Sequence, residues 1–494
     1  MKEGWDGRNG KQNRITRGAL RGPFVSIFSI LNQLVSDVNG VLWGVFFLIP
    51  LLCGTGIFYT IKLRFVQVRK FGLAARFLLG GASLFGKRAD KSGMSSFQAL
   101  ATAVAAQVGT GNVAGTATAL VAGGPGSLFW LWVAAFFGMA TIFAEAVLAQ
   151  TYRTKDEQGR VLGGPAYYIT LGMGEKWRPL AVFFSIAIII ALGCIGNMVQ
   201  SNSIAHAMQT AFNVPAAVSG VVCAVLAGLV FFGGVGRLAS VTEKIVPFMA
   251  AIYLIGGLWV IGAHITEVIP AFRLIFVAAF DPEAVMGGAL GLTVAKAMQF
   301  GVARGLFSNE AGMGSTPHAH AVARVEHPAE QGLVAMFGVF TTVVIVTFTG
   351  IVILVTGVLD FKTTGIELTQ HAYTVGLGSF GMAFVAVCLF FFAFSTIIGW
   401  YFFGEQNVRF LFRSRGVLAY RVIVCAFIVT GAMLKVDFVW SLADLFNGLM
   451  VLPNLVALVA LHKVVGESLE DFEKKLDHYE ERKSENIDDR MQRL

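Results

Sequence analysis

Two glycine-rich stretches carry polar residues in the middle of otherwise apolar segments. The first is GTGN at 109–112, inside ATAVAAQVGTGNVAGTATAL, and the second is GLFSNEAGMGS at 305–315. Glycines such as Gly109 and Gly111 allow a helix to unwind and a ligand to approach its backbone closely. Unwinding frees carbonyl groups, which suit a bare cation, and N–H groups, which suit an anion. An amino-acid zwitterion accompanied by a sodium ion needs both kinds of group.

Each stretch also has a structural explanation. GTGN could be a notch of small residues for helix packing, as in GxxxG contacts, although packing alone does not require the polar side chain of Asn112. Glu310 is an ionisable residue near membrane depth and is therefore a functional candidate. It could instead tie the unwound backbone together or pair with Arg304, and the sequence leaves these roles open.

The composition is that of a helical membrane protein. Of the 494 residues, 55% are hydrophobic and 14% are charged, and the mean hydropathy is +0.69. A soluble domain has about a quarter of its residues charged. Apolar runs long enough to cross a bilayer as helices recur along the chain, whereas an outer-membrane barrel would show short alternating segments. The net charge of +8 resides in loops, where it sets topology, so no nucleic-acid partner is expected.

Eleven spans are predicted, and the second and seventh contain the glycine-rich stretches. The ranges are 38–62, 94–122, 126–151, 178–206, 214–234, 244–263, 284–316, 332–358, 376–403, 418–435 and 439–462. Without the first span ten remain, and the broken ones are numbers one and six of these. An odd number of crossings in each half makes the second half (284–462) inverted relative to the first (94–263). Paired interrupted spans at matching places in two halves are typical of the central site of a secondary transporter.

Loop charges predict the orientation. Cytoplasmic loops are the basic ones, which places the C-terminus in the cytoplasm and the N-terminus outside, although six basic residues before Pro23 run against this. Residues 1–37 are expected to form a basic segment that lies along the interface, and residues 463–494 a charged cytoplasmic tail that is either a solvated helix or a partner-binding one. The basic loop residues are Arg64, Arg69, Lys70, Arg76, Lys87, Arg88, Lys91, Arg153, Lys155, Arg160, Lys176, Arg409, Arg413 and Arg415.

Several motifs together resemble the alanine or glycine:cation symporter family, whose members are sodium:amino-acid symporters. VGTGNVAGTATAL, GGPGSLFWLW (123–132), GGPAYYI (163–169), GNMVQSNSIA (196–205) and GLFSNEAGMGS occur in the family's order. The family usually has methionine where Leu131 stands, an apolar exchange. The resemblance implies an all-α membrane fold of the leucine-transporter type, a 5+5 inverted repeat whose first and sixth core helices are broken, here preceded by one extra helix.

The resemblance also implies a substrate site at the two breaks. The substrate carboxylate would meet the N–H groups of Thr110 and Gly111, and its ammonium the carbonyls around Phe307 and Ser308. Further contacts would come from Gln107, Gln200, Asn309, Thr396 and Trp400. As alternatives, Trp400 could belong to an interfacial aromatic belt and Gln200 could join helices.

A sodium site is implied in the same way. Its ligands would be the carbonyls of Ala105, Val108 and Phe392 with the hydroxyls of Ser395 and Thr396, and Asn112 would contribute to a second ion. Ser395 and Thr396 could instead bond carbonyls of their own helix.

The sequence therefore predicts a sodium-coupled importer of a small neutral amino acid, alanine or glycine, in the bacterial inner membrane. The alternatives are proton coupling through Glu310 or Glu145, and a glutamine importer of the same fold. An intramembrane enzyme would need paired carboxylates, histidine clusters or a Ser/Lys dyad, and a channel would need a filter of repeated polar groups. Nothing in the sequence indicates the oligomeric state.

Three histidines and one short motif complete the set of candidates. His318, His320 and His327 are expected on a cytoplasmic loop, where the absence of an HExxH pattern argues against a metal site. GGPAYYI is too short to cross the membrane and is expected to be either a re-entrant segment or a loop turn. Glu145 is expected to pair within the bundle. The five cysteines stand singly in apolar runs and are expected to be buried thiols.

Overall fold

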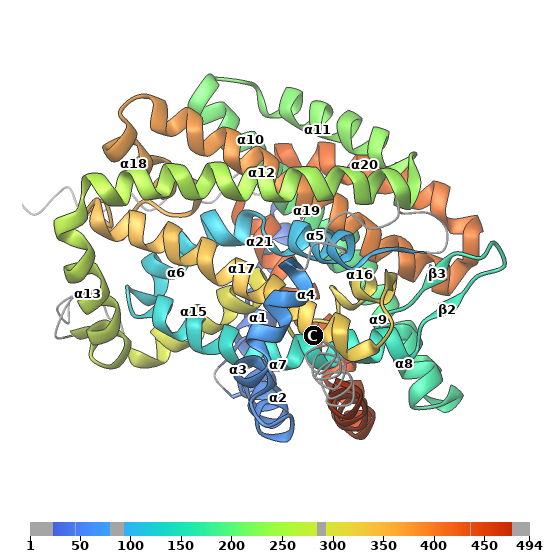
Figure 1. Cartoon of the computed structure of the whole chain (residues 1–494). Coiled ribbons are helices and arrows are strands. Elements are labelled where there is room, and N and C mark those ends of the chain that lie inside the picture. The colour runs from blue at the N-terminus through green and yellow to red at the C-terminus, as the bar shows by residue number, and fades with distance from the viewer. Residues whose placement is uncertain (1–22, 45, 80–92, 284–292, 435, 477–494) are drawn as a thin grey trace, which may run out of the picture.

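The computed structural model describes residues 23–44, 46–79, 93–283, 293–434 and 436–476, and it is almost entirely helical (Figure 1). Within these residues six helical runs have the length and apolar composition to cross a membrane. They are Ser127–Thr151, Glu175–Phe212, Gly234–Ala263, Pro328–Val355, Phe380–Met433 and Val439–Ala460. Two shorter apolar helices are Leu48–Lys62 and Ala216–Phe231. Predicted features at 1–22, 284–292 and 477–494, and the basic residues Lys87, Arg88 and Lys91, lie outside the described residues.

The described elements occur in the following order along the chain. The first half contains α1 (Pro23–Leu42), α2 (Leu48–Lys62), α3 (Val66–Arg69), α4 (Phe71–Leu79), β1 (Met94–Ser95), α5 (Ser96–Gln107), η1 (Gly111–Gly115), α6 (Thr116–Gly123), α7 (Ser127–Thr151), β2 (Thr154–Lys155), β3 (Val161–Leu162), α8 (Pro165–Gly172), η2 (Glu175–Trp177), α9 (Arg178–Ile188), η3 (Ile189–Gly196), α10 (Asn197–Phe212), α11 (Ala216–Phe231) and α12 (Gly234–Ala263). The second contains η4 (Ile265–Glu267), α13 (Val268–Phe280), α15 (Val294–Asn309), α16 (Pro317–Ala321), β4 (Ala323–Arg324), α17 (Pro328–Val355), α18 (Gly365–Leu377), α19 (Phe380–Phe412), η6 (Arg413–Gly416), α20 (Val417–Met433) and α21 (Val436–Ala460).

The first glycine-rich stretch interrupts its helix. A capping box between Ser95 and Gln98 starts α5, which ends at Gln107. Val108 then leaves helical geometry (φ −96°, ψ 84°), and a π-helical turn over Gly111–Gly115 leads into α6. π-Turns are often found at functional sites. The predicted span 94–122 is therefore two helical pieces joined at GTGN.

The second glycine-rich stretch breaks later than the sequence indicated. Helix α15 continues through Phe307 and Ser308 to Asn309, so the break lies inside the predicted stretch 305–315, but Phe307 and Ser308 belong to the last helical turn and not to unwound backbone. Glu310 then takes a left-handed conformation (φ 56°), and positive φ angles at Gly312 (83°) and Gly314 (79°) carry the chain to α16. No residue from 305 to 309 has a positive φ, and Glu310 is the first residue of the stretch to leave helical geometry.

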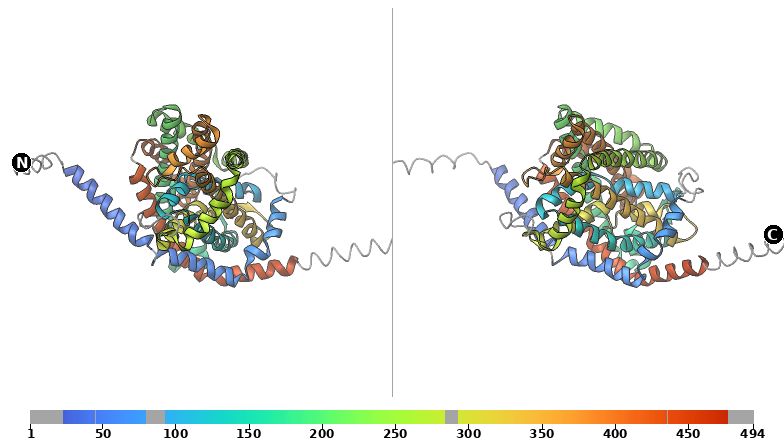
Figure 2. Two further views of the ribbon diagram at one scale, coloured as in Figure 1. Left: turned by 90° about the vertical axis from the view of Figure 1, so that its left-hand side faces the viewer. Right: turned by 60° about the vertical axis from the view of Figure 1, so that its left-hand side comes forward.

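The predicted first span is divided. Helix α1 ends at Leu42 and α2 begins at Leu48, so a single helix over 38–62 is wrong. The indole of Trp43 donates to Asp444 O (2.9 Å), which fixes the turn between the two helices against α21. In Figure 2, α1 extends away from the body of the molecule, while α2 packs against α7.

The C-terminal helix packs on the rest of the chain. Residues 462–476 are helical, and Leu469 and Phe472 are buried. Glu473 accepts from Arg69 (3.1 Å) and Lys70 (3.2 Å), which lie beyond α2. The described part of the tail is therefore not a fully solvated helix, and its apolar side is already covered by the rest of the chain and is not free to bind a partner.

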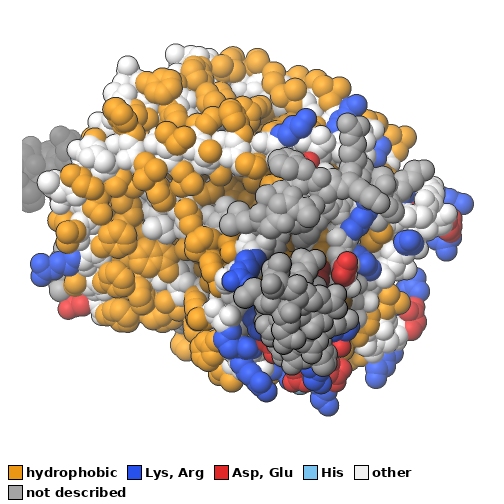
Figure 3. Space-filling view, viewed as in Figure 1, with side chains coloured by type: hydrophobic (Ala, Val, Ile, Leu, Met, Phe, Trp, Pro, Cys, Tyr) orange, Lys and Arg blue, Asp and Glu red, His pale blue; other side chains and the backbone are white. Residues whose placement is uncertain are grey.

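Hydrophobic and charged side chains occupy different parts of the surface. In Figure 3 hydrophobic side chains cover the face over α12 and α13, whereas Lys and Arg gather at the end that carries β2 and β3 and near α2. Two small sheets lie at this basic end: β2 pairs antiparallel with β3, and β1 pairs parallel with β4. The β1–β4 pair joins the start of α5 to the segment after α16, so it ties the two broken helices together.

Candidate functional site

The two broken segments lie against each other in the interior. The side chain of Gln107, the last residue of α5, donates from Nε2 to Asn309 O, the last residue of α15 (2.6 Å). A Cβ placed on Gly111 would lie 3.6 Å from Ser308 Cα and would crowd the Phe307 ring. Thr110 and Ser308 are both buried. The chain thus brings together two breaks that are about 200 residues apart in sequence.

At the first break, side chains bond the unwound backbone. Asn112 Oδ1 accepts from Gly109 N (3.1 Å), and Gln200 Oε1, from α10, accepts from Thr110 N (3.2 Å). The oxygen of Asn112 is therefore engaged within GTGN itself. Gln200 joins helices, which was one of its two expected roles, and it does so at the break.

At the second break, Glu310 bonds the unwound segment to α19. Its carboxylate accepts from Trp400 Nε1 (2.6 Å) and from Ser315 Oγ (2.5 Å). The pairing with Arg304 considered from the sequence does not form, because Arg304 pairs with Asp444 on α21 (2.9 Å). Trp400 is 2% exposed, so it is a buried hydrogen-bonding residue and does not belong to an interfacial belt.

Glu145, on α7, bonds the next part of the same segment. Its two oxygens accept from Gly314 N (2.9 Å) and Gly312 N (3.0 Å). A third bond comes from Asn454 Nδ2 on α21 (2.7 Å), and Asn454 Oδ1 accepts in turn from the hydroxyl of Tyr168. Tyr168 belongs to GGPAYYI, which forms a short helix, α8, buried at Pro165–Ile169. Glu145 pairs within the bundle, as expected, and its partners are the backbone of the second break.

Six side chains around the breaks carry buried polar atoms that have no hydrogen-bond partner among the described residues. They are Gln107 Oε1, Thr110 Oγ1, Asn112 Nδ2, Gln200 Nε2, Ser308 Oγ and Asn309 Nδ2. Buried polar groups are almost always satisfied, because an unpaired one costs about 1–3 kcal/mol. Such a concentration at one place is what a site for a polar ligand requires.

Aromatic rings line one side of this polar cluster. Phe307 packs edge-on against Trp400 (ring centroids 6.0 Å apart) and tilted against Trp440 of α21 (5.3 Å). The Arg304 guanidinium lies 5.3 Å from the centre of the Trp440 ring, and Arg304 and its partner Asp444 line a cavity of about 400 Å³. The sequence reasoning missed three residues of this region, Trp440, Asp444 and Asn454. The available signal was the presence of two polar residues, Asp444 and Asn454, inside an apolar span.

Five oxygens meet where α5 ends beside α19. Thr396 Oγ1 lies 2.9 Å from Ala105 O and 3.4 Å from Val108 O, and Ser395 Oγ lies 3.4 Å from Ala105 O. Both hydroxyls also lie within hydrogen-bond distance of Phe392 O on their own helix (2.9 and 3.0 Å). The alternative role considered for Ser395 and Thr396, bonding to a carbonyl of α19, is therefore present as well. The five oxygens are fully buried, which suits a hard cation such as sodium, although Met249 Sδ also lies 3.4 Å from Ser395 Oγ.

The histidine segment is not a surface loop. His318 and His320 are buried in α16, so their expected place on a cytoplasmic loop is wrong. His318 lies between Ser315 O (2.6 Å) and Asn407 Nδ2 (2.8 Å), and His320 lies 2.8 Å from Gln331. In the described ranges no three His, Cys, Asp or Glu side chains are grouped as metal ligands.

Comparisons with known proteins identify relatives over nearly the whole chain. The model of the sodium:alanine symporter family matches residues 28–486. The sodium/alanine symporter AgcS of Methanococcus maripaludis is 42% identical, over 88% of this chain and 95% of that protein. The probable sodium/glutamine symporter GlnT of Bacillus subtilis is 41% identical, over 90% and 91%. A solved manganese transporter of Eremococcus coleocola matches with a TM-score of 0.48 and 14% identity, over 71% of this chain and 74% of that one.

Proposed function

The chain belongs to the sodium:alanine symporter family, and we propose that it is a sodium-coupled importer of a small neutral amino acid, alanine or glycine. Membership of a family of symporters, together with amino-acid transporters among the relatives, supports amino-acid symport across a membrane. The particular substrate and the sodium coupling are the proposal. The observation that carries it is the cluster of unpaired buried polar atoms where the two broken helices meet.

The proposed substrate site uses the charge at the two helix ends. Thr110 and Gly111 lie where the second piece of the first broken helix begins, and this positive end attracts a carboxylate. Phe307 and Ser308 lie in the last turn of α15, whose carbonyls form a negative end that attracts an ammonium. The unpaired hydroxyls of Thr110 and Ser308 add one hydrogen bond to each group.

The remaining predicted residues complete this site. Three side-chain amides each use one end to bond the backbone of a broken segment and leave the other end unpaired. They belong to Gln107, Gln200 and Asn309. The Phe307 ring, against which Trp400 packs, leaves little room beside Gly111, which favours a small substrate. Glutamine, which a relative's name specifies, would need a place for its longer side chain, and it is the second candidate.

Sodium is proposed to bind the oxygens of Ala105, Val108, Phe392, Ser395 and Thr396. This cluster joins α5 to α19, so a bound ion would favour the state in which these helices are close. Glu145 accepts three hydrogen bonds and Glu310 accepts two, so both side chains hold the second break in place, and coupling to a proton on either residue is the alternative to sodium. A role for Asn112 in a second ion site is retained as a prediction.

We also propose the architecture and orientation. The predicted spans would comprise a first repeat over 94–263 and an inverted repeat over 284–462, preceded by one extra helix, for which α2 (Leu48–Lys62) replaces the predicted 38–62. The basic end with β2 and β3 would face the cytoplasm, together with the tail at 463–494, and residues 1–37 would lie at the outer face. A membrane potential of ~100 mV would then contribute ~2.3 kcal/mol for each charge carried inward, or roughly 50-fold in accumulation.

Uptake by the purified protein in proteoliposomes tests this function. Labelled alanine, glycine and glutamine are supplied with an inward sodium gradient, with a proton gradient alone and with neither. We expect alanine or glycine uptake that needs sodium. Uptake driven by protons without sodium would overturn the ion assignment, and uptake of glutamine alone would overturn the substrate assignment.

Thr110→Val is expected to raise the apparent KM for alanine about 10-fold. The change removes a hydroxyl next to the substrate carboxylate, and a hydrogen bond to a charged group contributes about 1.5 kcal/mol. The measurement is sodium-driven uptake against alanine concentration. Thr341→Val is the matched control, because the hydroxyl of Thr341 bonds Phe337 O of its own helix. An unchanged KM in the first variant would remove Thr110 from the site.

Ser395→Ala is expected to raise the half-saturating sodium concentration about 10-fold while leaving uptake at saturating sodium nearly unchanged. One of five ion ligands is lost, and the other four remain. Ser201→Ala is the control, since the buried hydroxyl of Ser201 bonds Met198 O on its own helix. If Ser395→Ala instead lowers the maximal rate with no change in sodium dependence, Ser395 does not bind the ion.

A further inference from the structure

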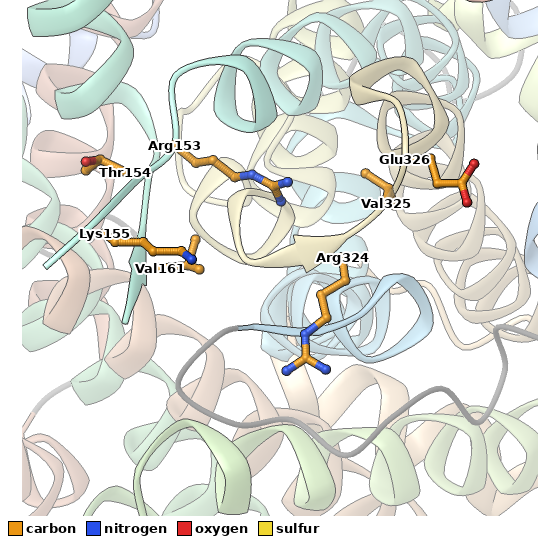
Figure 4. Close-up of a pocket in the computed structure, with 7 residues that line it drawn as sticks. All are labelled: Arg153, Thr154, Lys155, Val161, Arg324, Val325 and Glu326. Carbon is orange, nitrogen blue, oxygen red and sulfur yellow. The ribbon is translucent and has the colours of Figure 1, made fainter. Parts of the chain in front are cut away.

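A cavity of about 370 Å³ lies where α12 begins, beside the end of α19. Its lining includes residues 233–236 at the start of α12, Gln406 and Arg409 of α19, Val161 of β3 and Arg421 of α20. In Figure 1 α12 starts at the end of the molecule that carries β2 and β3. Val161 also lines the pocket of Figure 4, so the two cavities share a wall at β3. The residues proposed to hold the substrate and the sodium ion are not among the described residues that line this cavity.

Two buried side chains of this cavity carry polar atoms without a partner among the described residues. Arg409 is 9% exposed and Gln406 is 3% exposed. Arg409 Nη1 has no hydrogen-bond acceptor, and Gln406 Oε1 has no donor. The two residues are three positions apart on α19 and therefore share a face of that helix. Buried polar groups are almost always paired, so an unpaired donor and an unpaired acceptor here indicate a ligand that accepts one hydrogen bond and donates another.

The remaining part of the Arg409 guanidinium is held by Glu405. Arg409 Nε donates to Glu405 Oε1 (3.0 Å), and its Nη2 bonds the same oxygen. The other oxygen, Oε2, accepts from the hydroxyl of Tyr401 and lies 3.8 Å from Arg421 Nη2. One carboxylate is thus shared by two arginines, and both of its oxygens are engaged. Among the described residues this group keeps one positive charge for which it has no counter-ion.

The start of α12 adds backbone donors to the same cavity. The first N–H groups of a helix have no partner within the helix, and no side chain caps the start of α12. Gly234 and Gly236 lack side chains, so a ligand can approach these N–H groups closely. The positive end of the helix dipole favours an anion at this position. Arg160, which also lines the cavity, pairs with Asp156 (2.7 Å) and adds no surplus charge.

We propose that this cavity binds a small oxyanion that keeps one protonated oxygen, in particular hydrogen phosphate. Its charged oxygens accept from Arg409 Nη1 and from N–H groups at the start of α12, because a guanidinium is a strong donor to phosphate oxygens. Its O–H group donates to Gln406 Oε1. Sulfate has no O–H group at neutral pH and would place a charged oxygen against Gln406 Oε1. A phospholipid diester lacks this O–H group as well, so the source is free phosphate or a soluble phosphomonoester.

Calorimetric titration of the purified full-length chain in detergent tests the site without measuring transport. The probes are inorganic phosphate, glycerol 3-phosphate and sulfate, at constant ionic strength and about pH 6, where a phosphomonoester keeps its proton on about half of its molecules. We expect phosphate to bind about 10-fold more tightly than sulfate, since sulfate leaves the acceptor of Gln406 unpaired.

Two variants separate the roles of the two side chains. Arg409→Gln is expected to weaken binding of phosphate and sulfate about 30-fold, because a charge-assisted hydrogen bond is lost. Its control is Arg413→Gln, which removes the same charge from an exposed residue of the next turn. Gln406→Met is expected to weaken phosphate about 5-fold and to leave sulfate unchanged, because it removes the acceptor of the O–H group alone. Its control is Gln158→Met, on the exposed turn between β2 and β3.

Each outcome decides the proposal. Loss of phosphate binding in Arg409→Gln and a phosphate-specific loss in Gln406→Met support it, and the response to glycerol 3-phosphate identifies whether a phosphomonoester is accepted. Equal weakening in Arg413→Gln would show a general effect of surface charge and would overturn the site. Absence of saturable phosphate binding would overturn it as well. If Arg409→Gln fails to fold because Glu405 loses its partner, Gln406→Met decides alone, since no recorded contact is lost in it: equal binding of phosphate and sulfate before and after the change would overturn the proposal.

Discussion

Replacing Gly109 with alanine is expected to reduce sodium-driven alanine uptake about 100-fold. A Cβ at this position would collide with Thr396 Oγ1 and lie 3.0 Å from Gln200 Oε1. Thr396 is a proposed sodium ligand, and Gln200 accepts from Thr110 N. Relief of the collision would therefore displace groups at the ion site, at the substrate site, or at both. Overpacking of this kind costs about 1–3 kcal/mol, and 3 kcal/mol corresponds to roughly 100-fold.

The matched control is Gly262→Ala near the end of α12, where an added Cβ has no atom within 4 Å. Both variants are reconstituted at equal amounts, and initial uptake rates are compared at several sodium concentrations. Normal uptake by Gly109→Ala would mean that Thr396 and Gln200 can move without consequence. The proposed sites at GTGN would then be wrong.

Glu145→Gln is expected to lower uptake about 100-fold and to lower the unfolding temperature. Three donors converge on the Glu145 carboxylate: Gly312 N, Gly314 N and Asn454 Nδ2. Glutamine keeps one acceptor oxygen and turns an NH₂ group toward a donor, so at least one buried donor loses its partner. The loss of a bond to a charged acceptor costs about 1.5–3 kcal/mol. The unwound segment after Glu310 would lose the contact that holds it to α7.

Glu267→Gln is the control, because Glu267 is exposed beside α13. Thermal unfolding in detergent and uptake in proteoliposomes are measured for both variants. Normal stability together with normal uptake in Glu145→Gln would show that the segment is held by other contacts. Normal stability with lost uptake would instead indicate that Glu145 carries a proton, which is the coupling considered as an alternative to sodium.

The location of the first break could be predicted from the sequence, and the second only in part. Gly109 and Gly111 lie together in an apolar run, and a helix is weakest at such a point. In the second stretch Gly305 is compatible with helical geometry, and α15 continues past Gly305 to Asn309. Its end depends on Glu310, whose left-handed backbone is fixed by bonds to Trp400 and Ser315. These contacts are tertiary and have no local signal.

The sequence was less informative about buried polar partners. The histidines of STPHAHA looked like loop residues because polar neighbours and Pro317 surround them, yet packing against α19 and α7 buries them. Similarly, hydropathy treated 38–62 as one apolar run, because it takes no account of the bond from Trp43 to Asp444 O on α21. Side-chain contacts between segments 89 residues apart (His318 and Asn407) and 401 residues apart (Trp43 and Asp444) decided the two cases.

Helices α2 and α3 depend on residues that lie about 400 positions later in the chain. Tyr59, on α2, donates to Leu458 O across 399 residues, and Arg69 pairs with Glu473 across 404. A ribosome adds about 5–20 residues each second, so α2 is synthesised roughly 20–80 s before these partners exist. During that interval the exposed side of α2 must be held by lipid or by the insertion machinery. Release of an incomplete chain would leave its opening helices without their final neighbours.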